Sequence, residues 1–130
     1  MAEALRLAVA SRTDADRARR EARALALSLG FGPADVERVA LATSELATNL
    51  AIYARRGEII LTALGGGLQL ESHDAGPGIR DLDEALADGF STGGGLGSGL
   101  PATRRLMDEF EIASGPNGTN IVARKWAPKI

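Results

Sequence analysis

A glycine-rich stretch from Asp74 to Gly97 divides the chain into two patterned parts and leads straight into a segment with helical spacing. It holds seven glycines, one proline and four acidic residues beyond Asp74, with few apolar residues that could anchor it in a core. A loop of this length inside a compact domain is usually functional or mobile. We therefore expect the stretch to be a functional loop between two segments that build the core.

The composition limits the chemistry that such a loop can serve. A chain of 130 residues is expected to form one domain, residues 1–130, with a single sizeable core. The net charge of −2 argues against a nucleic-acid-binding domain, since such domains carry a strongly basic face. The absence of cysteine and the single histidine exclude disulfides, thiol nucleophiles and polyhistidine metal clusters. No apolar run approaches the roughly 20 residues that span a bilayer, and no secretory signal is evident, which predicts a cytoplasmic protein without a membrane segment.

Hydrophobic periodicity predicts the order strand, two helices, hairpin, glycine-rich loop, helix and hairpin. We expect an α/β (α+β) two-layer sandwich, with helices on one face of a mixed five-stranded sheet. The predicted elements are a strand over Leu5–Val9, a helix from the caps at 11–14 to Gly30, a helix from Pro33 to about Ala54, strands over Glu58–Leu64 and Leu68–His73, a short helix near Asp83–Ala87, a helix over Leu100–Met107, a strand from Phe110, and a strand over Ile121–Trp126.

Glu45 and Asn49 stand four residues apart in the second predicted helix and therefore share one stripe of its surface. Arg38 and Leu41 precede them on nearly the same stripe, beside the apolar face. A solvated polar edge is the ordinary interpretation of such a pair. A carboxylate that takes a proton, next to a carboxamide oxygen suited to Mg²⁺, is the functional alternative.

The sequence Asp74-Ala75-Gly76-Pro77-Gly78 follows a predicted strand directly. Asp, Gly and Pro are the commonest turn residues, so a turn is the simplest interpretation. An aspartate at a strand end followed by two glycines can also present its carboxylate to a donor while the backbone approaches a flat ligand.

The run from Gly93 to Gly99 continues directly into the next helix, which is unusual for a flexible linker. Consecutive backbone N–H groups and a helix N-terminus form a site for phosphate when no side chain blocks the approach. Gly118-Thr119 follows Asn117 at the last hairpin, where a hairpin turn is the strong ordinary interpretation.

The order of these four motifs resembles the GHKL ATPase/kinase superfamily, which has the Bergerat fold, over nearly the whole chain. The segments from Asp88 to Thr92 and from Arg105 to Phe110, and the ending from Val122 to Trp126, are similar to the stressosome switch serine/threonine kinases of the RsbT type, which are related to the RsbW-type anti-sigma factor kinases.

The resemblance implies a site for ATP and Mg²⁺. It implies that Glu45 acts as the general base or polarises the attacking hydroxyl, that Asn49 binds Mg²⁺, and that Asp74 accepts a hydrogen bond from the adenine amino group. Thr119 would support the adenine contact, and the stretch from Asp74 to Leu96 would act as a lid. The glycines would admit the base or wrap the phosphates: Gly76, Gly78, Gly95, Gly97 and Gly99.

The same resemblance implies an ATP-dependent protein serine/threonine kinase that acts as a partner-switching regulator in a stress-response pathway. Its partners would be STAS-domain proteins and a phosphatase that it activates, with no nucleic acid and no membrane. An anti-sigma factor or a phosphatase-activating binding module is the alternative, and the ATP-binding piece of a sensor histidine kinase is disfavoured because no segment remains for a phospho-acceptor domain.

One departure from the family pattern concerns the basic residue that would balance the negative charge of the phosphates. Many relatives place a basic residue between the Glu and Asn of the first motif, whereas residues 46–48 here are Leu, Ala and Thr. Arg104 and Arg105 are candidates to supply the charge instead. His73, beside Asp74, is expected at a polar or half-buried strand position, and the resemblance assigns it no role.

Overall fold

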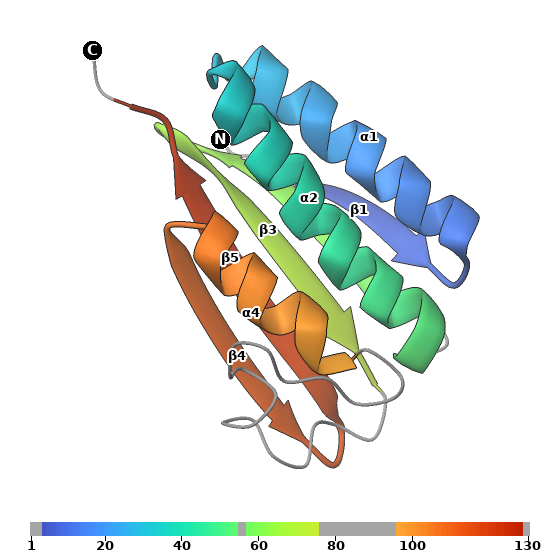
Figure 1. The fold of residues 1–130 in the computed structure, drawn as a ribbon. Helices are drawn as coiled ribbons and strands as arrows, with labels where there is room; N and C mark the ends of the chain where they lie inside the picture. Colours follow the sequence, from blue (N-terminus) through green and yellow to red (C-terminus); the bar gives the residue numbers. More distant parts are fainter. Residues whose placement is uncertain (1–3, 55–56, 76–95, 129–130) are drawn as a thin grey trace.

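The computed structural model describes residues 4–54, 57–75 and 96–128. Five strands form one sheet in the order β1-β2-β3-β5-β4, and the helices cover one of its faces (Figure 1). The elements are β1 (Ala4–Val9), α1 (Arg12–Ser28), α2 (Pro33–Asn49), the π-helical turn η1 (Leu50–Ala54), β2 (Gly57–Leu64), β3 (Gly67–Asp74), α4 (Leu96–Leu106), β4 (Glu109–Gly115) and β5 (Gly118–Trp126).

The two-layer arrangement with five strands and one helical face confirms the predicted fold class, but the sheet is not mixed. All four strand pairings are antiparallel. A helical connection such as α4 would allow the strands that it joins, β3 and β4, to pair as parallel neighbours. They do not meet because β5 turns back from β4 and occupies the place beside β3, which leaves β4 at the edge.

Helix α1 is held in place by an N-cap, by an ion pair with α2 and by a buried stripe of small side chains. The Ser11 hydroxyl accepts a hydrogen bond from the Asp14 amide, an N-cap that satisfies one of the free donors of the first turn. On α2, Glu37 receives two hydrogen bonds from the Arg23 guanidinium, at 3.1 and 2.6 Å, and this contact lowers the pKa of Glu37 below its ordinary value. The buried side of α1 is a stripe of alanines: Ala15, Ala18, Ala22 and Ala26.

The core lies between the sheet and the helices. Its largest buried side chains are Leu46 and Leu50 from the α2–η1 segment, Ile59, Leu61, Leu68 and Leu70 from the central strands, and Leu100 from α4. No helix within the described ranges is long and apolar enough to cross a membrane.

Helix α4 begins at Leu96, four residues before the predicted start, so that Gly97 and Gly99 belong to its first turns. Glycine disfavours a helix interior by about 1 kcal/mol relative to alanine. Packing offsets this cost, because Leu100 and Thr103 are fully buried where α4 lies beside α2 (Figure 1). The short helix predicted near 83–87 lies outside the described residues.

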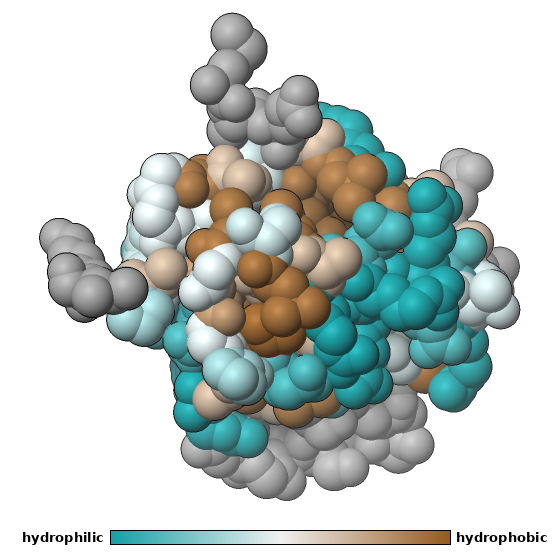
Figure 2. All heavy atoms as spheres, turned by 90° about the horizontal axis from the view of Figure 1, so that it is seen from above, coloured by the Kyte–Doolittle hydropathy of each residue, from teal (hydrophilic) through white to brown (hydrophobic). Residues whose placement is uncertain are grey.

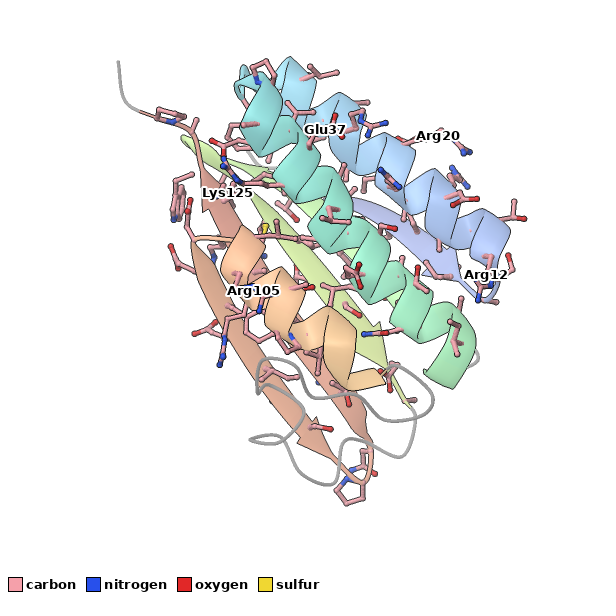
Figure 3. All side chains as sticks on the ribbon, viewed as in Figure 1. Arg12, Arg20, Glu37, Arg105 and Lys125 are labelled. Carbon is pink, nitrogen blue, oxygen red and sulfur yellow. The ribbon has the colours of Figure 1, made fainter. Side chains whose placement is uncertain are left out.

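Lys125 ties three elements together at the end of the molecule where α2 begins (Figure 3). Its ammonium group donates to the Leu106 carbonyl at 3.1 Å and to the Asp108 carboxylate at 3.2 Å, and lies 3.7 Å from the Asp35 carboxylate. Only 11% of the side chain is exposed. This one cation therefore joins the start of α2, the end of α4 and the end of β5.

Replacing Lys125 with methionine is expected to lower the free energy of unfolding by about 1–3 kcal/mol, because the Asp108 carboxylate and the Leu106 carbonyl lose their donor and the Asp35 carboxylate loses an ion-pair partner. Urea denaturation measures the change. Arg6→Met is the matched control, since the Arg6–Glu58 pair is exposed and is expected to contribute less than about 1 kcal/mol. Equal losses in the two variants would contradict the bridging role of Lys125.

Candidate functional site

The four sequence motifs gather at one end of the molecule. The C-terminal end of α2, the end of β3, the first turn of α4 and the start of β5 meet at the lower end of the view in Figure 1. Antiparallel pairing explains part of this, because β3 ends where its partner β5 begins. Motifs separated by up to about half of the chain thereby form one candidate site.

Glu45 and Asn49 come from the last turns of α2, and both are half-buried. The spacing of four residues places them one above the other on the same helix face. Asn49 is the last α-helical residue, and the wider turn η1 follows it immediately. Single π-helical turns are rare and are frequent at functional sites, and periodicity alone did not reveal this one.

Asp74 and Thr119 are direct register partners on neighbouring strands. Thr119 is buried, with 7% of its surface exposed, and its hydroxyl lies 2.8 Å from the Ser114 hydroxyl across the β4–β5 hairpin. Ser114 is a contact that sequence reasoning missed, since a hydroxyl pair is visible only once the hairpin register is known. The structure thus brings the two residues predicted for the adenine contact side by side.

Gly118 permits the close approach of the hairpin to the end of β3. A Cβ atom at this position would lie 1.9 Å from the Asp74 carbonyl oxygen and 3.0 Å from the Ala75 Cα atom. The backbone also has φ of +135°, which side chains rarely tolerate. Gly118 therefore fixes the strand end that carries the Asp74 carboxylate, and the sequence alone indicated only a turn here.

Leu50 connects the helical pair to the strand pair. Its side chain packs on Gly57, where an added Cβ would lie 2.5 Å from the Leu50 Cδ2 atom and 2.7 Å from the His73 carbonyl oxygen. Gly57 is the register partner of Asp74 on β2. The residue after Asn49 therefore rests on the residue beside Asp74, a contact that no local sequence pattern indicates.

The remaining predicted contacts are placed only in part. Gly97 and Gly99 lie at the start of α4, where backbone N–H groups have no helical partner and favour an anion. Arg104 and Arg105 are exposed in the last turn of α4, about two turns away from Gly97. Figure 3 labels Arg105 toward that end of the helix. Gly76, Gly78, Gly95 and the rest of the expected lid lie outside the described residues.

His73 occupies the half-buried strand position that the sequence indicated, on the sheet face away from the helices. Its Nδ1 atom lies 2.6 Å from the Asn120 side-chain oxygen and its Nε2 atom 3.1 Å from the Glu71 carboxylate. Successive strand residues point to opposite faces, so His73 and Asp74 face apart. The histidine therefore belongs to a cross-strand polar network on the outer face.

The side-chain oxygen atoms at this end of the molecule suit a hydroxyl substrate and a hard cation. Glu45 supplies a carboxylate that can accept a proton, and Asn49 supplies a carboxamide oxygen of the kind that Mg²⁺ prefers. Mg²⁺ commonly takes one or two protein ligands and completes its shell with phosphate and water. The half-buried Asn49 oxygen, next to a helix N-terminus, fits a Mg²⁺–triphosphate, while Asp74 and Thr119 fit the polar edge of a base.

Comparison with known proteins identifies a family and similar proteins. Residues 8–125 match the family described as the histidine kinase-like ATPase domain. The serine/threonine-protein kinase RsbT of Bacillus subtilis (strain 168) is 46% identical over 114 residues, which cover 84% of this chain and 86% of RsbT. A solved structure of the RsbU and RsbW domains of Rv1364c from Mycobacterium tuberculosis is similar with a TM-score of 0.68 and 20% identity. That match covers 100% of this chain but only 33% of the solved one, and at this identity it concerns the fold alone.

Proposed function

The chain belongs to the family of histidine kinase-like ATPase domains, and from this premise we propose that it is an ATP- and Mg²⁺-dependent protein serine/threonine kinase. It acts as a partner-switching regulator that phosphorylates STAS-domain proteins in a stress-response pathway. The 46% identity to RsbT supports the activity. The observation that carries the site assignment is the meeting of Glu45 and Asn49 with the Asp74–Thr119 pair at one end of the fold.

We assign each residue a role that its position supports. Asp74 accepts a hydrogen bond from the exocyclic amino group of adenine, and the Ser114–Thr119 pair supports the polar edge of the base. The start of α4, with Gly97 and Gly99, offers backbone N–H groups to the phosphates. Asn49 would hold Mg²⁺, which supplies charge neutralisation on the phosphates when bound.

The chain's contribution to transfer is positioning and proton removal. Glu45 orients the acceptor hydroxyl and takes its proton as the hydroxyl oxygen forms a bond to the γ-phosphorus. The bond between that phosphorus and the bridging oxygen of ADP breaks, and ADP leaves. Positioning and electrostatic stabilisation provide most of the rate enhancement in phosphoryl transfer.

The acceptor is a separate protein, because no histidine lies on a helix of the described chain and His73 is held in the outer-face network. We assign it to the STAS class, with a phosphatase as a second partner that the kinase activates by binding. ATP is abundant in the cytoplasm, which is where this activity would operate.

A phosphotransfer assay tests the proposal. The chain, radiolabelled ATP, Mg²⁺ and a recombinant STAS-domain protein are incubated together, and the modified residue is mapped by mass spectrometry. We expect an acid-stable phosphate on a serine or threonine of the STAS-domain protein, with slow hydrolysis in its absence. Acid-labile phosphohistidine would contradict the proposal. A STAS-domain protein that binds tightly without being phosphorylated would favour a binding module of the anti-sigma type.

A further inference from the structure

Two large apolar side chains are exposed on the same helical segment as Glu45. Leu41 of α2 is 41% exposed, and Ile52 of η1 is 43% exposed. They precede and follow Glu45 by four and seven residues. At 1.5 Å per residue these separations amount to roughly 6 Å and 10 Å along the helix axis.

The spacing places both side chains on the side of the helix that carries Glu45. Residues four or seven apart recur on one helical face, and the wider turn of η1 shifts the second position only partly away from it. The opposite side of α2 is committed to the core through Val39, Leu46 and Ala47. Leu41 and Ile52 therefore bracket Glu45 on the open surface and take no part in the core.

We propose that Leu41 and Ile52 are docking contacts for the phospho-acceptor protein, an inference that rests on the proposed kinase function. The acceptor hydroxyl must come within hydrogen-bond reach, about 3 Å, of the half-buried Glu45 carboxylate. A folded partner buries on the order of 800 Å² of this chain's surface in a stable complex. A footprint of that size, centred on Glu45, covers positions about 10 Å away on either side.

The protein that docks on Leu41 and Ile52 is thus a folded protein, and apolar side chains surround the serine or threonine that it presents. Water and small alcohols gain nothing from Leu41 and Ile52, whereas an apolar rim on a protein acceptor removes both side chains from water. The pair therefore selects a protein acceptor and contributes to its affinity. The chemical step remains with Glu45.

The double variant Leu41→Ala with Ile52→Ala tests the inference by steady-state kinetics. The substrate is a recombinant STAS-domain protein that the unaltered chain phosphorylates. We expect KM for this protein to rise roughly tenfold or more, because truncating central apolar contacts weakens interfaces by such factors. ATP affinity, measured by calorimetry, is expected to stay within about twofold, since neither side chain belongs to the proposed nucleotide contacts.

Leu27→Ala is the matched control. Leu27 is 60% exposed near the end of α1, at the opposite end of the molecule from Glu45. Figure 2 views that opposite end and shows apolar surface there beside a hydrophilic region. This variant is expected to keep the KM of the unaltered chain, which separates loss of docking from a general loss of exposed apolar surface.

The outcomes distinguish the docking inference from the kinase proposal. A double variant with unchanged KM, or an equal rise in Leu27→Ala, would overturn the docking inference while the kinase proposal stands. A fall in ATP affinity matching the loss in transfer would also overturn docking, because the pair would then act on the nucleotide site. Failure of the unaltered chain to phosphorylate any STAS-domain protein would overturn the proposed function itself.

Discussion

Glu45→Gln is expected to slow phosphoryl transfer to the acceptor protein by about 10²- to 10⁴-fold, the usual contribution of a positioned general base. Glutamine keeps the size of the side chain and its place on α2, but it cannot take the hydroxyl proton. ATP affinity is expected to change little, because the adenine contacts lie on β3 and β5. The loss should therefore fall on kcat and not on the KM for ATP.

Single-turnover kinetics with radiolabelled ATP measures the effect, with calorimetry as the check on nucleotide binding. Glu37→Gln is the control on the same helix, since Glu37 is exposed and paired with Arg23 two turns before Glu45. That variant is expected to transfer phosphate at the unaltered rate. Unchanged turnover in Glu45→Gln would remove Glu45 from the role of base and leave positioning alone to explain the rate.

Hydrophobic periodicity and capping residues predicted most of the helices and strands, because these signals lie within or next to each element. The Ser11 cap marks the beginning of α1 and Pro33 marks the beginning of α2, as expected from the sequence. The segment from Pro33 to Ala54 was predicted as one helix. The structure keeps that extent but changes its last turn to a π-helix, a shift in hydrogen bonding that apolar spacing does not record.

The pairing of strands depended on information that local patterns lack. A helix between β3 and β4 is compatible with either a parallel or an antiparallel neighbour for β3. Only the return of β5 into the place beside β3 decides the outcome, and this made the expectation of a mixed sheet wrong. The start of α4 was misplaced for a related reason, since burial of Leu100 against the rest of the fold outweighs weak local helix propensity.

In the candidate site, too, some contacts could be predicted from local sequence patterns and others could not. The Glu45–Asn49 pair follows from helical spacing, so the sequence was sufficient to place both on one face. The Asp74–Thr119 pair depends on sheet register, and the sequence indicated it only through the resemblance to a family. The contacts of Ser114 with Thr119 and of Leu50 with Gly57 join residues whose only relation is in space, and no sequence pattern predicted them.

Gly118→Ala is expected to be the most damaging single substitution at this end of the molecule. The new methyl group would overlap the Asp74 carbonyl oxygen, and the φ of +135° would itself be strained for alanine. Backbone strain of this kind costs on the order of 1–3 kcal/mol, and relief of the overlap requires β5 to move away from the end of β3. Because Asp74 and Thr119 are register partners there, we expect the free energy of unfolding and the ATP affinity to fall together.

Urea denaturation and ATP calorimetry measure the two effects, with an expected stability loss of about 3 kcal/mol or more and at least a tenfold loss of ATP affinity. Gly115→Ala is the matched control, since Gly115 is the register partner of Gly118 in the same hairpin and an added Cβ meets nothing within 4 Å. Asp74→Asn is the companion variant. It is expected to keep the stability and lose about 1.5–3 kcal/mol of ATP binding, because it removes only the charge of the acceptor. If Gly118→Ala weakened ATP binding no more than Gly115→Ala does, the close approach of the hairpin would not be what holds Asp74 in position, and the adenine assignment would then depend on the Asp74→Asn result alone.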